Sequence, residues 1–305
     1  MQNSVVLQYE EWIVDKMLDR PDRNGNNGID YLKSKNIIFT KSGYSYQIAK
    51  EGFWCKNPML PRQNVIFMRI ELPFIIPSTY EPNATNGYLA VLDHSTVFDS
   101  NAYHFTEPQD FRWVEKFFNS EKRKNRVCIM TSDMDPKGQE WEKIQQRSFR
   151  REIIKFFSEK MGEDFHFYGN GWHCGGNSRK GYVAPYEKKH EVLSWYQFNF
   201  AVEGESYDGY ISEKIFQAMA SGCVPIYSGP KDIKKYIPDN VYIGCMDKDL
   251  DRILKIVQEM TDDEIENYRK NIKDFLDSEK SDLFSSITFA KTIEKIFIEK
   301  GILKC

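Results

Sequence analysis

The chain has 305 residues, enough for about two domains of roughly 150 residues each. Its 42 Lys and Arg residues against 45 Asp and Glu residues give a formal net charge of −3, which argues against binding of nucleic acid by bulk charge. Aromatic residues make up 14% of the chain, too many for a disordered protein. No stretch approaches the roughly 18–20 uninterrupted apolar residues of a membrane span, and the N-terminal segment lacks the apolar region of a secretory signal. We therefore expect a soluble, cytoplasmic α/β protein.

The N-terminal part contains three short apolar runs bounded by Gly, Pro, Asn or Ser, a pattern typical of buried strands. These runs are residues 36–43, 64–73 and 87–95. The charged run NSEKRKNR (119–126) then interrupts the pattern, and we predict that it separates an N-terminal domain, 1–120, from a second domain.

From residue 121 onward, apolar runs alternate with amphipathic segments. Strands are predicted at 126–133, 165–172, 198–202 and 224–230, and helices at 145–161 and 212–222. This alternation predicts a parallel sheet with helices on both faces, in which ligands bind beyond the carboxyl ends of the strands. We assign residues 121–280 to this domain.

The last part of the chain is predicted to be helical. Thr261 and Glu264 form a capping box before an amphipathic run. Apolar residues with helical spacing then follow: Leu283, Ile287, Ala290, Ile293 and Phe297. Flanking lysines make peripheral contact with a membrane surface an alternative. Because Glu294 and Glu299 interrupt the basic residues, we expect the helix of 281–305 to pack on or between the domains.

Polar residues gather where the predicted strand 198–202 ends and the next helix begins. Glu203 and Glu205 follow the strand directly, Ser212 is a good N-cap, and Lys214 falls in the first helical turn. A helix N-terminus beside a cation is a natural site for a diphosphate, and a nearby carboxylate can hold ribose hydroxyls. From the spacing alone, an ordinary βαβ unit with surface charges explains these residues equally well.

The same segment, 198–230, resembles the signature of the α-1,3-fucosyltransferases. That signature is roughly Phe-Glu-Asn, a polar gap, Tyr-x-Thr-Glu-Lys, a helix, then Val/Ile-Pro-Ile/Val and Gly. The matching residues are Glu203, Tyr210, Ser212, Glu213, Lys214, Val224, Pro225, Ile226 and Gly229. The resemblance covers 127–242 well and 57–99 thinly. Val202 stands where the family has Phe, and Gly204 stands where it has Asn.

The resemblance implies an inverting glycosyltransferase of the GT-B fold, with two Rossmann-like domains facing a cleft. It implies transfer of a sugar, most simply L-fucose from GDP-fucose, to a hydroxyl of a glycan acceptor, with no required cofactor and no divalent metal. The N-terminal domain would bind the acceptor and the second domain the nucleotide sugar. Because Gly204 replaces an Asn near the donor, a xylosyl-, galactosyl- or other hexosyltransferase is one alternative. A non-catalytic carbohydrate- or nucleotide-binding module is another.

The resemblance also implies roles for single residues. Glu71, after the strand predicted at 64–73, matches the family's proposed general base. Arg150 matches an Arg that binds the donor diphosphate, with Arg147 and Arg151 as alternatives. A solvated helix face explains this arginine cluster without the resemblance.

Roles at the signature itself follow in the same way. Lys214 and the helix start at Ser212 would neutralise the leaving diphosphate, and Glu213 would hold the ribose. Tyr210 would pack on or hydrogen-bond the nucleotide. Two carboxylates would face the donor sugar or orient the cations: Glu203 and Glu205.

Other polar residues give weaker signals. Asp133 and Asp135 form an Asp-x-Asp pair after a predicted strand, which we interpret as a polar loop because Lys214 and Arg150 would already supply positive charge. His173 is interpreted as a loop histidine that could also line the cleft. The six cysteines form no CxxC pair, so we expect reduced thiols.

Overall fold

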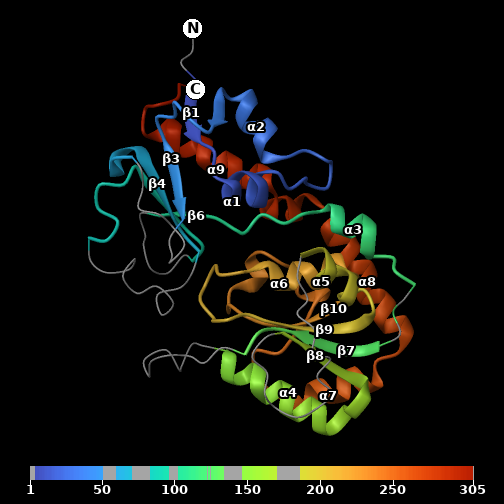
Figure 1. Ribbon diagram of the computed structural model, residues 1–305. Helices are drawn as coiled ribbons and strands as arrows, with labels where there is room; N and C mark the ends of the chain where they lie inside the picture. Colours follow the sequence, from blue (N-terminus) through green and yellow to red (C-terminus); the bar gives the residue numbers. More distant parts are fainter. Residues whose placement is uncertain are drawn as a thin grey trace. The chain divides into compact units, whose positions relative to one another are not determined.

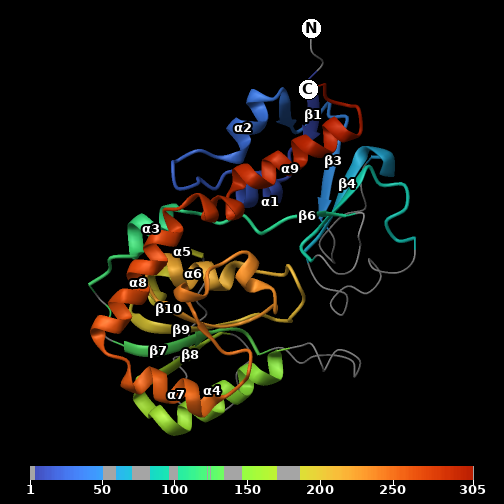
Figure 2. The same cartoon turned by 180° about the vertical axis from the view of Figure 1, so that it is seen from behind.

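The computed structural model describes residues 4–50, 60–70, 83–95, 102–121, 123, 125–133, 146–169 and 186–304. The chain divides into two compact units (Figures 1 and 2). Unit 1 comprises Met1–Asp110, Asp208–Tyr210 and Asp282–Cys305, and unit 2 comprises Phe111–Tyr207 and Ile211–Ser281. Each unit is an α/β structure with parallel strands, as the sequence predicted. None of the described helices is long and apolar enough to cross a membrane.

Unit 2 begins about ten residues before the predicted boundary at residue 120. The short helix α3 (Arg112–Phe117) lies in this interval, and aromatic side chains in and directly before it pack against other residues of unit 2. The Phe111 ring lies 5.7 Å from the Phe216 ring, and the Trp113 ring lies 5.2 Å from the His190 ring. Arg123, in the charged run, donates to backbone carbonyls of Tyr196 and Ser221 within the same unit. The charged run therefore lies inside unit 2. The assignment of acceptor and donor binding to the two domains stays a prediction.

The described residues of unit 1 form a four-stranded parallel sheet and a two-stranded parallel sheet. The larger sheet has the order β3 (Gln47–Lys50), β4 (Val65–Arg69), β5 (Ala90–Asp93) and β6 (Tyr103–His104). The smaller sheet pairs β1 (Val5–Gln8) with β2 (Ile37–Thr40). The helical segments of this unit are α1 (Glu11–Ile13), a π-helical turn (Val14–Leu18), α2 (Gly28–Ser34), a 3₁₀ turn (Arg62–Asn64) and α9 (Ser286–Glu299).

The C-terminal helix α9 belongs to unit 1 and forms part of its core. Its buried face consists of Ser286, Phe289, Ala290, Ile293, Ile296 and Phe297. These side chains pack with the apolar residues of β1, α2 and the strands of the larger sheet, and both ribbon views show α9 beside β1 and α2 (Figures 1 and 2). The apolar face of α9 is thus occupied inside the protein and is not presented to a membrane surface. Leu283, predicted to lie on this face, precedes the helix and is exposed.

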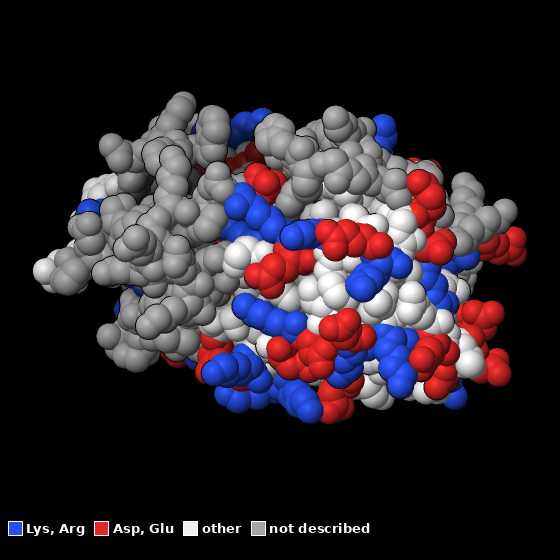
Figure 3. Space-filling view, turned by 90° about the horizontal axis from the view of Figure 1, so that it is seen from below, with Lys and Arg blue, Asp and Glu red and all other residues white. Residues whose placement is uncertain are grey.

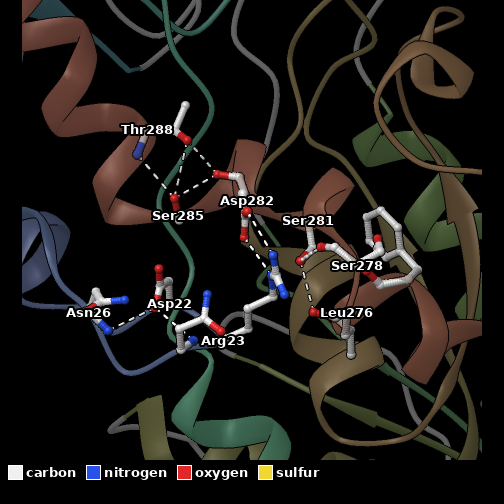
Figure 4. A network of polar contacts seen from close by, with 11 residues as sticks. Asp22, Arg23, Asn26, Leu276, Ser278, Ser281, Asp282, Ser285 and Thr288 are labelled. Atoms are coloured by element: carbon white, nitrogen blue, oxygen red, sulfur yellow. Dashed lines mark hydrogen bonds and ion pairs between the residues drawn. The ribbon is translucent and has the colours of Figure 1, made fainter.

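The chain returns from unit 2 to unit 1 inside a 3₁₀ helix, Glu279–Phe284 (Figure 4). On the unit 2 side, the Ser281 hydroxyl donates to backbone carbonyls at the end of α8. On the unit 1 side, the Asp282 carboxylate accepts from Arg23 Nε at 2.9 Å, and its carbonyl accepts from the Ser285 and Thr288 hydroxyls. Each side of the crossing is therefore anchored within its own unit.

In unit 2, the part of the chain that the structure describes forms a five-stranded parallel sheet with the order β11-β10-β9-β7-β8. The strands are β7 (Asn125–Met130), β8 (Phe165–Tyr168), β9 (Tyr196–Val202), β10 (Val224–Ser228) and β11 (Ile243–Gly244). The α-helices besides α3 are α4 (Arg147–Met161), α5 (Tyr186–Leu193), α6 (Glu213–Ala220), α7 (Leu250–Glu259) and α8 (Asp262–Leu276). Short 3₁₀ turns are Gly162–Asp164, Ile233–Lys235 and Asp239–Val241.

Helices cover both faces of the unit 2 sheet. Side chains of α4 and α7 share one apolar cluster with the sheet, whereas α5 and α6 contribute to a second cluster with Cys128 and Tyr196. Figure 1 shows α4 and α7 on one side of the strands and α5 and α6 on the other. The strands β8, β9 and β10 are buried along almost their whole length. This explains why they appear in the sequence as continuous apolar runs.

The surface carries closely interleaved charges. On the face displayed in Figure 3, basic and acidic side chains alternate among the described residues. Several form ion pairs along one helix, such as Lys255 with Glu259 on α7 and Lys273 with Asp277 at the end of α8. On this face, the described residues form no large patch of a single charge.

Replacing Gly28 with alanine tests the packing of α2 on α9. The Gly28 N–H donates to the Ser286 hydroxyl at 2.9 Å, and an added Cβ would lie 2.6 Å from the Ser286 carbonyl oxygen and 2.8 Å from Leu18 Cδ2. We expect Gly28→Ala to lower the free energy of unfolding by about 1–3 kcal/mol, despite the higher helix propensity of Ala. Urea denaturation measures this.

The matched control is Gly244→Ala, whose new methyl group would lie 3.5 Å from the nearest atom, Met246 Cε. A Gly28→Ala protein as stable as the wild type would show that the two helices pack less closely than described.

Candidate active site

The candidate site lies at the carboxyl ends of β9 and β10 in unit 2. The N-termini of α4 and α6 meet these strand ends, since the backbone N–H of Gln146 donates to Gly204 O at 2.8 Å and the Ser212 N–H donates to Glu203. The strands are parallel neighbours, with Val202 paired to Ser228. This is the edge of a parallel α/β sheet where ligands bind. Six of the eight predicted site residues come together here.

The Glu203 carboxylate is the centre of this arrangement. Its side chain has no exposed area. It accepts hydrogen bonds from the Ser212 N–H at 3.0 Å, the Ser212 hydroxyl at 2.5 Å and the Tyr227 hydroxyl at 3.2 Å. Ser212 occupies the N-cap position of α6, but its side chain makes no capping hydrogen bond. Ser212 thus occupies the predicted N-cap position, and its hydroxyl donates to Glu203 Oε2 and accepts from Lys214 Nζ.

The Lys214 ammonium lies beside two carboxylates. Its Nζ donates to the Ser212 hydroxyl at 3.0 Å and lies 3.6 Å from both Glu203 Oε2 and Glu213 Oε1. The side chain keeps 24% of its area exposed, so a ligand can reach it. These contacts fix the position of the cation in advance. An anionic ligand would compete with the carboxylates for the same ammonium.

Glu213 is ionised down to unusually low pH. Burial alone would raise the pKa of its carboxyl. The charges of Lys214 and of Lys189 on α5, with hydrogen bonds involving its own backbone N–H and Ser212, outweigh burial and lower the pKa to about 2. A carboxylate that stays charged is a strong acceptor for hydroxyl groups.

The arginines of α4 lie beside the end of β9. Arg150 is 7% exposed, and its Nε and Nη2 donate to Val202 O at 3.2 and 2.7 Å. Arg147 Nη2 lies 3.6 Å from Oε1 of the buried Glu205. Burial and the Glu205 charge raise the pKa of Tyr207 to about 12, which keeps that phenol protonated. The arginines at 147 and 150 are thus held within the protein and do not form a solvated helix face.

Arg151 has a different position from its two neighbours. Its side chain is 41% exposed and its Nε donates to Asp133 Oδ1 at 2.6 Å. Asp133 is thus held by an arginine in the described structure. Asp135 and His173 lie outside the described residues. Among the residues that are described, no group of three or more His, Cys, Asp or Glu side chains could hold a metal ion.

Two hydrogen bonds join Gln146, directly before α4, to Ser228 at the end of β10. The Gln146 Nε2 donates to the Ser228 carbonyl at 3.3 Å, and the Ser228 hydroxyl donates to Gln146 Oε1. Four residues of this site were not predicted from the sequence: Gln146, Lys189, Tyr227 and Ser228. A usable signal existed for the pair Tyr227 and Ser228, since polar groups at the end of a buried strand need partners.

The remaining two predicted site residues are Tyr210 and Glu71. Tyr210 belongs to unit 1, where its ring centroid lies 4.9 Å from that of His94. Glu71 lies outside the described residues. The strand before it ends at Arg69, whose Nη1 lies 3.1 Å from Oδ2 of Asp93 at the end of β5. Both side chains of this ion pair are at least 95% buried.

A family model of glycosyltransferase family 10 (fucosyltransferase), C-terminal part, matches residues 120–274, just over half of the chain. The chain belongs to this family. The matched range contains β7–β11 and the residues around Glu203 and Lys214, so it includes the whole candidate site of unit 2. The predicted family is confirmed.

Curated relatives match over short segments. An α-(1,4)-fucosyltransferase of Arabidopsis thaliana is 31% identical over 81 residues, which are 26% of this chain and 20% of the relative. A GDP-fucose protein O-fucosyltransferase 3 of Danio rerio is 37% identical over 51 residues, which are 17% of this chain and 11% of the relative. The matches thus span a fifth or less of the length of these relatives.

Solved structures match over nearly the whole chain. An α1,3-fucosyltransferase with GDP-fucose has a TM-score of 0.55 and 13% identity, and the match covers 97% of this chain and 91% of that one. An α-glucosyltransferase with UDP and DNA has a TM-score of 0.54 and 10% identity, with 98% and 100% covered. At such identities the likeness shows the fold, and the predicted GT-B class is confirmed.

The low pKa of Glu213 makes stability depend on pH. Because the pKa in the folded protein, about 2, is below the ordinary value of 4.5, the stabilising contribution is complete above about pH 4.5 and is lost as the pH falls towards 2. We expect wild type to exceed Glu213→Gln by up to about 3 kcal/mol in free energy of unfolding at pH 7. This difference should close between pH 4.5 and 2 in urea denaturation series.

Glu259→Gln, on the exposed side of α7, controls for the removal of one carboxylate. A difference between wild type and Glu213→Gln that stays constant over this pH range would contradict the assigned pKa.

Proposed function

We propose that this protein is an inverting glycosyltransferase that transfers L-fucose from GDP-fucose to a hydroxyl of a glycan acceptor. The observation that carries the proposal is the cluster of Glu203, Ser212, Glu213 and Lys214 at the start of α6, inside the family match. Relatives in the same family carry fucosyltransferase names, and a structure of this fold was solved with GDP-fucose.

The arrangement suits departure of a diphosphate. In the transition state the leaving diphosphate gains negative charge, which preorganised cations and backbone N–H groups stabilise. Lys214 and the N-terminus of α6 supply such groups, and Arg150 adds a second cation close to the same strand end. We propose that these charges make a divalent metal unnecessary. The ionised Glu213 would accept hydrogen bonds from the ribose hydroxyls.

The remaining roles are proposed from the family resemblance. Glu71 would take the proton of the acceptor hydroxyl as it attacks the anomeric carbon from the face opposite the diphosphate. Tyr210 would pack on or hydrogen-bond the nucleotide. Glu205, held near Arg147, would face the donor sugar.

A second candidate is the same reaction with a different nucleotide sugar, and Gly204 favours it. Among the described residues, a Cβ at this position would meet only Arg150 Nη2, at 3.8 Å, and Gly204 is not among those with positive φ. Neither packing nor backbone strain therefore requires glycine here. The space beside Arg150 could hold additional atoms of a larger sugar, such as those of a hexose with its hydroxymethyl group.

A donor screen tests the proposal. Purified protein is incubated with nucleotide sugars, and both the released nucleoside diphosphate and the shift in melting temperature are measured. We expect GDP-fucose to give the largest shift, since a bound donor stabilises by mass action. A shift with a UDP-sugar and none with GDP-fucose would replace the fucosyl assignment by the second candidate.

The same assay with Lys214→Met should lower kcat/KM by about 10²- to 10³-fold, the usual loss for one donor that stabilises developing negative charge. Lys255→Met is the control, because Lys255 is 72% exposed on α7. Unchanged activity in Lys214→Met would contradict the proposed role of Lys214 in stabilising the leaving diphosphate.

Glu71→Gln separates an enzyme from a binding module. If Glu71 is the general base, this variant should bind the donor as the wild type does and lose most turnover, roughly 10²- to 10⁴-fold. Calorimetric titration with GDP-fucose and a turnover assay measure the two quantities. Turnover equal to that of the wild type would exclude Glu71 as the base, and absence of turnover in both proteins would favour the non-catalytic binding module.

A further inference from the structure

The last two residues of β10 hold the two helix starts that carry the candidate cations. Successive side chains of a strand point to opposite faces of the sheet. The Tyr227 hydroxyl donates to Glu203, which holds the start of α6, whereas the Ser228 hydroxyl donates to Gln146, directly before α4. One strand end thus tethers the start of α6 on one face and the start of α4 on the other.

Glu203 is built as an internal anchor. A fully buried carboxylate is tolerated only when hydrogen bonds and a counter-charge compensate its lost hydration. Both of its oxygens are engaged: Oε1 accepts from the Ser212 N–H and the Tyr227 hydroxyl, and Oε2 accepts from the Ser212 hydroxyl and lies 3.6 Å from Lys214 Nζ. With no exposed area, the carboxylate presents no surface to a ligand.

Tyr227 holds this anchor from the sheet. Its side chain is fully buried, and its hydroxyl reaches Glu203 Oε1 at 3.2 Å. The nearby Gly229 leaves room for this ring, since a Cβ there would lie 2.3 Å from the Tyr227 hydroxyl oxygen. A continuous series of side-chain hydrogen bonds therefore links β10 to Lys214, from Tyr227 to Glu203, from Glu203 to Ser212 and from Ser212 to Lys214.

We propose that Tyr227 and Glu203 are positioning residues, which fix the Lys214 ammonium for a nucleoside diphosphate without touching the nucleotide themselves. The proposal rests on the proposed function of the same site. The resemblance left two roles open for Glu203, to face the donor sugar or to orient the cations, and the proposal assigns the second. It also adds Tyr227, which no signature residue indicated.

Tyr227→Phe is the main test, because it removes one hydroxyl and keeps the ring. Dissociation constants are measured by calorimetry for two probes, GDP and GDP-fucose. If the hydroxyl positions Lys214, both constants should rise by the same factor, roughly tenfold, as expected for a hydrogen bond to a charged group. A rise for GDP-fucose alone would mean that the anchor contacts the sugar and would overturn the proposal. Unchanged constants with a lower melting temperature would also overturn it.

Tyr242→Phe is the matched control. Tyr242 is also buried and its ring lies 5.7 Å from that of Tyr227, but its hydroxyl makes no hydrogen bond within the described part of the chain. It should bind both probes as the wild type does. Weakening by this control equal to that of Tyr227→Phe would show a general effect of the aromatic pair and would overturn the proposal.

A double-mutant cycle separates positioning from general destabilisation. In a Lys214→Met background there is no ammonium to position, so Tyr227→Phe and Glu203→Gln should each cost no further affinity for GDP. Additive losses would identify a merely structural role and contradict the proposal. Failure of the wild type to bind GDP at all would instead refute the proposed GDP-dependent function, and this outcome is distinct from equal binding by wild type and variants.

Discussion

The buried carboxylate at the end of β9 is the constraint on which the candidate site depends. Leaving Glu203 without partners would cost several kcal/mol, so the groups around it must stay in place while the protein is folded. Those groups are the start of α6, the Lys214 ammonium and the hydroxyl of Tyr227. The stability of unit 2 and the geometry of its candidate phosphate site are therefore coupled through one side chain.

Three of the basic side chains at the site are already paired with carboxylates, whereas Arg150 donates to the Val202 carbonyl. Lys214 lies between two carboxylates, Arg147 faces Glu205, and Arg151 pairs with Asp133. Such pairing holds long, flexible side chains in one position before any ligand arrives, which lowers the entropy that binding must remove. Because each of these cations already has a carboxylate partner, an anion that binds to it gains less binding free energy than it would from an unpaired cation. A site of this kind selects ligands by the arrangement of their charges more than by their total charge.

The sequence predicted the class of fold and the location of the site better than the contacts within it. The buried strands of unit 2 appear as continuous apolar runs, and Glu203, Ser212 and Lys214 lie where a strand ends and a helix begins. Local patterns could not show that the Ser212 hydroxyl would donate to the Glu203 carboxylate, because the two residues are nine positions apart in the sequence. Tyr227 and Gln146 were missed for the same reason, since their partners lie 24 and 82 residues away in the chain. The charged run at 119–126 was mistaken for a boundary, although Arg123 in it binds carbonyls inside unit 2.

The place of α9 in unit 1 bears on how the protein is made. Unit 1 is assembled from the beginning and the end of the chain, and Phe289, Ile293 and Phe297 fill its interior. Because α9 follows unit 2 in the sequence, the core of unit 1 can be completed only after unit 2 has been synthesised. The apolar side chains of the N-terminal strands lack their α9 partners until then, and such exposed surface is the usual source of aggregation during folding.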